Sequence, residues 1–188
     1  MYFVIGMRRS GTSIFREIVQ SHPDVASCLF EPHDLWAAVD LAHFSRFKNL
    51  EWVNSTIDKF NRANIGAKFA LNSGTKALEW IWLDKTFNKP NFLFIRRCEE
   101  DTWNSVYKQD KDSVRGIVSH KEHRLTHERI YDQFARFCVR NPDRACMIDF
   151  EDLVKKPDQT MKTVWKTLKV KDHSIKHMIR KPENRRGL

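Results

Sequence analysis

The sequence predicts an α/β protein of three layers, α/β/α, in which helices cover both faces of a central parallel sheet. Two observations favour this fold class. Strand-like apolar runs alternate with helix-like runs along the chain, as is typical of parallel sheets covered on both sides. The first strand also leads into a P-loop-like phosphate-binding loop that joins a strand to a helix. The 188 residues fit a single domain over positions 1–188.

Short apolar runs predict the strands of this sheet. They cover Tyr2–Ile5, Ala67–Leu71, Phe92–Ile95 and Ala145–Ile148, and a further strand precedes Glu31. The most apolar run is Phe92–Ile95, and Asn88-Lys89-Pro90 forms a turn before it. Since ligands of parallel sheets bind at the carboxyl ends of the strands, the residues that follow these runs are the candidates for function.

Helices are predicted where apolar residues recur every three or four positions. In the first, over Thr12–Gln20, Ile14 and Ile18 share a face, and His22-Pro23 ends the helix. The charged segment Lys108–Arg124 is expected to be a surface excursion. Five further helices are expected. One carries the apolar positions of Leu50–Phe60, one begins at Ser73-Gly74 and carries Leu78 to Trp82, and one begins at Glu99. The last two are marked by Leu125, Ile130, Phe134 and Phe137, and by Met161, Val164, Trp165 and Leu168.

The loop after the first strand has the layout of a phosphate site. Gly6 and Gly11 are separated by four residues, and Thr12 and Ser13 follow. The two glycines allow the backbone to fold around an anion. The backbone N–H groups of Ser10–Ser13, at the start of a helix, can hold a phosphate without any side-chain charge, and the two hydroxyls add donors.

The position of the positive charge distinguishes this loop from a Walker A loop. Thr12 stands where that motif has lysine, while Arg8 and Arg9 supply cations earlier in the loop. The β- and γ-phosphates of a nucleoside triphosphate would therefore lose their usual cation. The loop predicts a phosphate cradle but argues against an ATPase.

A second anion site is predicted at the end of the most apolar strand. Arg96 and Arg97 terminate that strand, and Ser105 follows Arg97 by eight residues on the next helix. An arginine at a strand end and a serine one to two turns into the following helix can hold one more phosphate. This strand end and the first loop are expected at the same edge of the sheet.

The composition is compatible with an anionic ligand but does not identify it. Lys and Arg number 33 against 24 Asp and Glu, which gives a formal charge of +9. The 4 cysteines lack C-x-x-C spacing and form no Cys/His cluster, so reduced thiols are expected. No run approaches the roughly 18 apolar residues of a membrane span, and no basic segment precedes an apolar leader. These features predict a cytoplasmic protein.

Four motifs together resemble the sulfotransferases that use 3′-phosphoadenosine-5′-phosphosulfate (PAPS). Arg9–Ser13 resembles their loop for the 5′-phosphosulfate, although cytosolic relatives carry lysine at the position of Arg9. The pair Arg97 and Ser105 resembles their 3′-phosphate motif. Phe150–Leu153 resembles their Tyr-Glu-Asp-Leu segment, and Arg185-Arg186-Gly187 resembles the C-terminal Arg-Lys-Gly that closes on the 3′-phosphate. The motifs occur in the family's order over nearly the whole chain.

The resemblance implies an enzyme that transfers a sulfuryl group from PAPS to a hydroxyl, with no metal. Arg8 and the backbone of Ser10–Ser13 would bind the donor, and Arg9 would neutralise charge on the departing phosphate. Glu31, in a Glu-Pro pair that resembles the segment facing the sulfuryl group in carbohydrate and some bacterial sulfotransferases, is the first candidate for the base. His33 is the second, because histidine titrates near neutrality.

The acceptor class and two rival functions remain open in the sequence. A carbohydrate or small-molecule hydroxyl is the expected acceptor, and neither nucleic acid nor a membrane is an expected partner. One rival is a P-loop nucleotide kinase or NTPase with a deviant Walker A loop, for which Ala145–Asp149 resembles a Walker B strand. The other is a non-catalytic polyanion-binding protein, suggested by the charge and the 6 tryptophans, but no nucleic-acid motif accompanies them.

Overall fold

The structure is a computed structural model that describes residues 1–35, 37–38, 51–71, 80–110 and 119–179. Its strands are β1 (Tyr2–Met7), β2 (Cys28–Phe30), β3 (Gly66–Leu71), β4 (Asn91–Arg96) and β5 (Ala145–Asp149). The helices described are α1 (Thr12–Gln20), α3 (Glu51–Ala63), α4 (Ile81–Thr86), α5 (Glu99–Asp110), α6 (His120–Arg140), α7 (Phe150–Lys155) and α8 (Pro157–Leu168). A short 3-10 helix, η2, covers Lys176–Met178.

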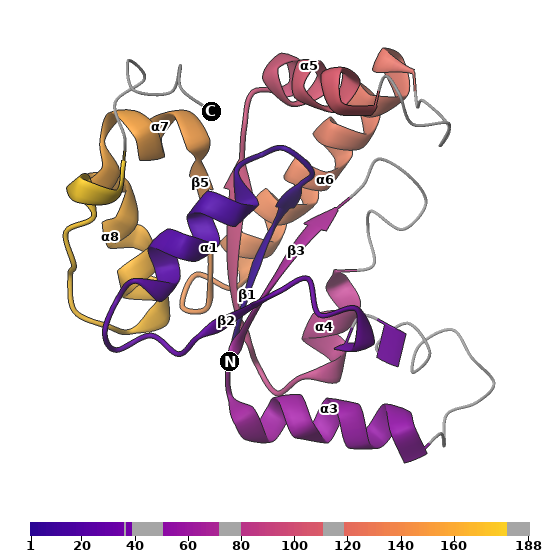
Figure 1. The fold of residues 1–188 in the computed structure, drawn as a ribbon, viewed down its shortest axis with the longest axis vertical. Coiled ribbons are helices and arrows are strands. Elements are labelled where there is room, and N and C mark those ends of the chain that lie inside the picture. Colours follow the sequence, from indigo (N-terminus) through magenta and orange to yellow (C-terminus); the bar gives the residue numbers. More distant parts are fainter. Residues whose placement is uncertain (36, 39–50, 72–79, 111–118, 180–188) are drawn as a thin grey trace.

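The five strands form one parallel sheet in the order β2-β3-β1-β4-β5. The central strand β1 is buried along its whole length, with β3 on one side and β4 on the other. The strand order therefore reverses at β1, and a ligand of such a sheet binds in the crevice at the carboxyl end of that strand. In Figure 1 the carboxyl end of β1 points toward the top of the molecule, where α5 and α7 also lie.

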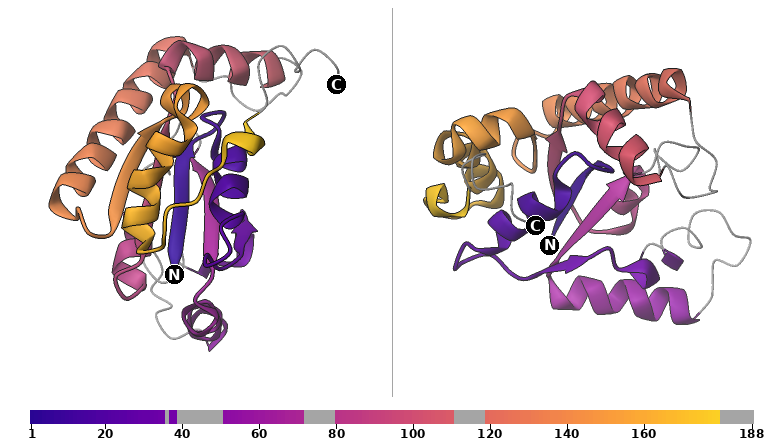
Figure 2. Two further views of the ribbon diagram at one scale, coloured as in Figure 1. Left: turned by 90° about the vertical axis from the view of Figure 1, so that its left-hand side faces the viewer. Right: turned by 45° about the horizontal axis from the view of Figure 1, so that its top comes forward.

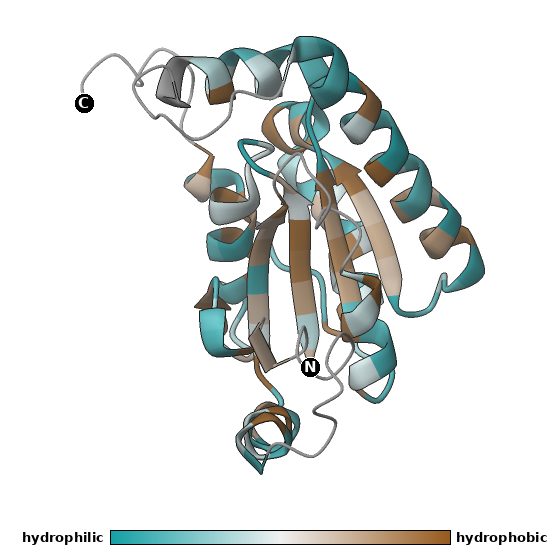
Figure 3. Ribbon diagram, turned by 90° about the vertical axis from the view of Figure 1, so that its right-hand side faces the viewer, coloured by the Kyte–Doolittle hydropathy of each residue, from teal (hydrophilic) through white to brown (hydrophobic). Residues whose placement is uncertain are grey.

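Helices cover the two faces of the sheet with separate apolar cores. Helices α1, α7 and α8 pack on one face through residues such as Phe15, Leu153 and Trp165, and α4 and α6 pack on the other (Figures 1 and 2). On the latter face the rings of Phe94 and Phe134 stack with centroids 4.0 Å apart. The central strands are hydrophobic along most of their length, as Figure 3 shows, because both faces are covered.

The predicted fold class is confirmed, and so is the first helix, Thr12–Gln20, at both ends. The expectation of a surface excursion over Lys108–Arg124 is wrong at both ends, since α5 continues to Asp110 and α6 begins at His120. Leu125 was expected on an apolar face but is 53% exposed. The predicted helix start at Ser73-Gly74 lies outside the described residues.

Helix α6 begins early because of a capping box that the charge of this segment obscured. The Ser119 hydroxyl accepts a hydrogen bond from the amide of Glu122, and the Glu122 carboxylate accepts one from the amide of Ser119 at 2.8 Å. This reciprocal pair satisfies two amides at the helix start. The charged residues that follow are therefore helical.

Candidate functional site

The loop between β1 and α1 requires glycine at both of its ends. A Cβ on Gly6 would lie 2.5 Å from the Ser10 hydroxyl and 2.7 Å from the carbonyl oxygen of Ile95. Gly11 has a φ of 93°, and a Cβ there would lie 2.6 Å from the ring of Phe150. The glycines thus let the loop lie tightly against β4 and α7, as the sequence pattern predicts.

Two residues of this loop hold its own shape. Ser10 is fully buried, and both its amide and its hydroxyl donate to the carbonyl oxygen of Met7, at 3.0 and 2.6 Å. The amide of Arg8 donates to the carbonyl of Leu71 on β3 at 2.8 Å. Ser10 was predicted to donate to a phosphate, but the structure commits these two donors inside the loop.

The N-terminus of α1 is open. The amide of Phe15 bonds to the carbonyl of Gly11, so the amides that precede it have no partner within the helix. Gly11 is the N-cap residue and provides no side-chain cap, and the first turn holds no acidic residue. The helix dipole therefore acts without local compensation at Gly11, Thr12 and Ser13, which favours an anion there.

A cleft of about 920 Å³ lies in front of this helix start. It brings together most of the residues that the sequence singled out. The predicted residues that line it are Arg8, Arg9, Gly11, Thr12, Ser13, Glu31 and Arg97, together with Lys68 and Phe150, which were not predicted as site residues. Its lining contains four Lys or Arg side chains but only two carboxylates, those of Glu17 and Glu31. The cleft is thus suited to an anion.

The second predicted anion motif is joined to the loop by hydrogen bonds. The Arg9 Nε donates to the Ser105 hydroxyl at 2.8 Å, and an Arg97 Nη donates to the carbonyl of Arg9 at 3.3 Å. The Arg97 guanidinium lies 5.0 Å from the centroid of the Phe150 ring and 3.6 Å from the Asp101 carboxylate. Its buried Nε has no hydrogen-bond partner among the described residues. The two motifs are therefore one structural unit.

Neighbouring arginines at the end of β4 have different roles. Arg96 forms two hydrogen bonds to the Asp149 carboxylate, at 2.6 and 3.0 Å, and this pairing raises the pKa of Arg96. Asp149 is the register partner of Arg96 on β5. Arg96 thus ties the two strand ends together, while Arg97 lines the cleft.

Glu31 is held in the cleft by a lysine that the sequence analysis missed. Lys68 lies in the middle of β3 and is 2% exposed, and its Nζ is 2.7 Å from the Glu31 carboxylate and 3.4 Å from the Ser13 hydroxyl. It also lies 3.9 Å from the centroid of the Phe30 ring. A lysine within an apolar strand was the available signal, because a buried charge requires a partner.

The lining of the cleft separates the two candidates for a base, because it includes Glu31 and not His33. Glu31 has a φ of 42° and Arg9 a φ of 69°, a region that residues with a side chain adopt at a cost. Both lie at the cleft. His33, two residues further on, is exposed and is not among the residues that line the cleft. The predicted C-terminal residues Arg185, Arg186 and Gly187 lie outside the described part of the chain.

Two features are absent from the described residues. No three His, Cys, Asp or Glu side chains there are grouped so that they could hold a metal ion. No helix there is both long enough and apolar enough to cross a membrane.

Comparison with known proteins identifies a family. Residues 1–182 match the family model described as "Sulfotransferase domain". Three solved structures have the same fold. The sulfotransferase domain from the curacin biosynthetic pathway is 16% identical with a TM-score of 0.64, and the match covers 92% of this chain and 75% of that chain. The sulfotransferase domain of the Synechococcus PCC 7002 olefin synthase is 15% identical with a TM-score of 0.63, covering 93% of this chain and 74% of that chain. Mouse sulfotransferase SULT7A1 complexed with PAP is 13% identical with a TM-score of 0.58, covering 95% of this chain and 60% of that chain. No curated protein sequence matches the chain significantly.

Proposed function

This chain belongs to the sulfotransferase domain family, and from that premise we propose that it transfers a sulfuryl group from PAPS to a hydroxyl of a carbohydrate or small-molecule acceptor. The observation that carries the proposal is the pairing of an uncapped helix start with two linked arginines. The amides of Gly11–Ser13 have no hydrogen-bond partner among the described residues, and Arg9 and Arg97 lie beside them in the same cleft. Two anion-binding groups at one cleft suit a nucleotide that carries phosphates at both its 5′ and 3′ positions.

The residues present fit such a donor. The amides of Gly11–Ser13 and the guanidinium of Arg9 would hold the 5′-phosphate, and Arg97 with Ser105 would hold the 3′-phosphate. The unpartnered, buried Nε of Arg97 supports this assignment, because a buried donor without an acceptor is costly and a phosphate oxygen would satisfy it. When bound, the donor supplies the sulfuryl group and a phosphate leaving group. The mouse SULT7A1 structure contains PAP, which is consistent with this choice of donor.

We assign the base to Glu31. Its carboxylate lines the cleft, and the ion pair with Lys68 fixes its orientation beside α1. As the acceptor oxygen attacks, its proton would pass to a Glu31 carboxylate oxygen, a contribution of roughly 10²–10⁴ in rate. Arg9 would stabilise the negative charge that develops on the departing phosphate, which is worth about 10²–10³.

Stabilisation by the bisphosphate product, 3′-phosphoadenosine-5′-phosphate, tests the donor first. At about 100 times Kd, binding adds about 2.7 kcal/mol to the stability. For a chain of this size the melting temperature should then rise by roughly 5–10 °C without any metal. A rise only with ATP and magnesium would replace the proposal with a kinase or NTPase, and no rise with either would favour a polyanion binder.

Replacement of Glu31 by Gln then tests the base. Turnover with radiolabelled donor and a panel of sugars, phenols and alcohols should fall roughly 10²–10⁴-fold, while affinity for the bisphosphate stays unchanged. Glu17→Gln is the matched control, because Glu17 is the other carboxylate of the cleft and lies on α1. Equal losses in the two variants would contradict the role of Glu31.

A further inference from the structure

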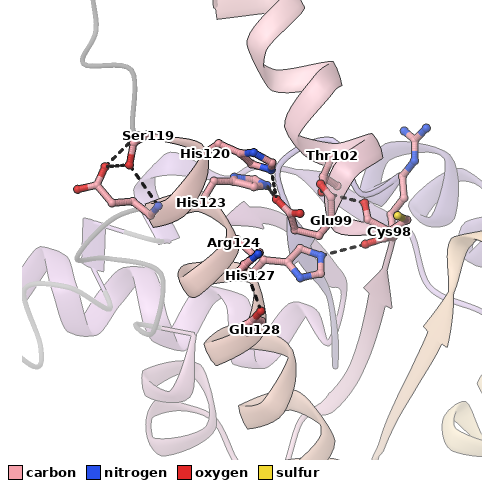
Figure 4. A network of polar contacts seen from close by, with 11 residues as sticks. Cys98, Glu99, Thr102, Ser119, His120, His123, Arg124, His127 and Glu128 are labelled. Carbon is pink, nitrogen blue, oxygen red and sulfur yellow. Dashed lines mark hydrogen bonds and ion pairs between the residues drawn. The ribbon is translucent and has the colours of Figure 1, made fainter.

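Three histidines on one face of α6 contact the segment that carries Arg97. They are spaced three and four residues apart, so they share a face of the helix. The Nε2 atoms of His120 and His123 lie 3.1 and 3.9 Å from Oε1 of Glu99, the first residue of α5. The Nε2 of His127 lies 2.9 Å from the carbonyl oxygen of Arg97 (Figure 4). Helix α6 thus holds the junction between β4 and α5.

His127 is placed to fix the backbone of Arg97 itself. Arg97 lies between β4 and α5, in neither element. His127 is 8% exposed, and burial lowers its pKa, whereas its hydrogen bond to Arg97 has the opposite effect. A carbonyl oxygen can only accept a hydrogen bond, so this contact requires a proton on Nε2 of His127.

The next turn of α6 adds further contacts to the same strand ends. Tyr131 is 4% exposed, and its hydroxyl donates to the carbonyl of Ile95 at 3.0 Å and accepts from the amide of Met7 at 3.3 Å. Its ring contacts that of His127 edge-on, with centroids 4.5 Å apart. Side chains of α6 thus hold the ends of β1 and β4, the two strands from which the phosphate loop and Arg97 extend.

The Glu99 carboxylate, at the start of α5, lies against histidines of α6. Glu99 follows Arg97 by two residues in the sequence, and its carboxylate lies beside His120 and His123. Trp103, one turn further along α5, stacks on the His120 ring at 4.9 Å and 17°. This interface directs Glu99 toward the histidines.

We propose that His127 is a positioning residue for the reaction: by holding the carbonyl oxygen of Arg97 it directs the Arg97 guanidinium at the anionic end of the donor. This role rests on the proposed function, because it assumes that Arg97 binds a phosphate. His127 itself does not line the 920 Å³ cleft and acts through Arg97.

Two substitutions of His127 separate the hydrogen bond from packing. His127→Gln can place an amide N–H close to where Nε2 lies, whereas the shorter side chain of His127→Asn cannot reach that position. His22→Asn is the matched control. His22 is 3% exposed, and its Nε2 lies 2.8 Å from the carbonyl oxygen of Lys171, in a different part of the fold.

The measurements are the Kd for 3′-phosphoadenosine-5′-phosphate, the melting temperature, and hydrogen exchange of residues 96–105 without ligand. His127→Asn should weaken binding at least tenfold and speed exchange in 96–105, and His127→Gln should restore most of both. In an assay of turnover, KM for the donor should rise more than kcat falls. His22→Asn should lower the melting temperature but change Kd less than twofold.

The outcomes distinguish this inference from the function on which it rests. Equal donor affinity and equal exchange in the two His127 variants, with a wild type that binds the bisphosphate, would overturn the role of His127 alone. A wild type that does not bind the bisphosphate would overturn the proposed function and this inference together. Weaker binding in His22→Asn to the same extent would also overturn it, since general destabilisation would then explain the effect.

Discussion

Helices α1 and α6 both begin with amides that have no partner inside the helix, but the chain closes only one of them. At α6 the Ser119 hydroxyl and the Glu122 carboxylate form a complete capping box. At α1 the N-cap is Gly11, which has no side chain, and the first turn has no acid. The start of α6 is thus satisfied by its own side chains, whereas the start of α1 has no side-chain cap, which is what the proposed anion site requires.

The surroundings of the two helix starts differ in the same way. Arg8, Arg9 and Arg97 line the cleft in front of α1. At the start of α6 the Glu122 carboxylate supplies the negative charge instead. Hydrogen bonds from the backbone and hydroxyl of Ser119 lower the pKa of Glu122 below its usual value. The proposed anion site at α1 therefore rests on the charge around the helix start, and not on the glycine-containing loop alone.

Among substitutions at the two helix starts, removal of the Arg9 guanidinium should have the largest effect. Arg9→Ala should lower turnover about 10²–10³-fold, because charge on the leaving phosphate loses its partner. Circular dichroism should show an intact fold. Arg124→Ala, which removes an exposed arginine of α6 paired only with Glu128 among the described residues, is the control. A variant at Arg9 with near-normal turnover would refute its role.

An acidic residue in the first turn of α1 should make its N-terminus resemble that of α6, which has Glu122 there. Ser13 is exposed in the first turn, so Ser13→Asp supplies the carboxylate that α6 has. Helix stability should rise by about 0.3–1 kcal/mol, while affinity for 3′-phosphoadenosine-5′-phosphate should fall on the order of 100-fold, about 2.7 kcal/mol. Titration calorimetry and thermal unfolding measure both, and Ser13→Ala separates loss of the hydroxyl from gain of charge. Unchanged affinity in Ser13→Asp would place the anion elsewhere.

Removal of the cap at the start of α6 should have the smallest effect, and it should change stability and not donor binding. Ser119→Ala removes the cap and should lower the free energy of unfolding by about 1 kcal/mol, with donor affinity unchanged. Urea unfolding followed by circular dichroism gives this value. If Ser119→Ala weakened donor binding as strongly as Ser13→Asp, the functional contrast between the two helix starts would not hold.

The sequence predicted the parts of this site that depend on local patterns. Helix α1 and its loop follow from the spacing of Gly6 and Gly11 and from the apolar period of Thr12–Gln20, which is a local property. Lys68 has no such pattern, because its partner Glu31 is 37 residues away and the two meet only when β3 is in place. Such pairings depend on the tertiary structure.

Glu31 and His33 illustrate the same limit at shorter range. Both are plausible bases by residue type, and only the tertiary structure shows that Glu31 lines the cleft and His33 does not. The start of α6 could have been found, since Ser119 and Glu122 have the spacing of a capping box. The density of charge in that segment led instead to the expectation of a surface excursion.

Amide NMR during a titration with 3′-phosphoadenosine-5′-phosphate tests the central claim most directly, because it compares the two helix starts in one experiment. Binding at an open helix start should shift the amide signals of Gly11, Thr12 and Ser13 most strongly and leave those of Ser119 and Glu122 nearly unchanged. Saturable shifts centred on Gly11–Ser13 are the predicted result. Saturable binding that leaves these three amides unmoved would contradict the assignment of the anion site to the N-terminus of α1.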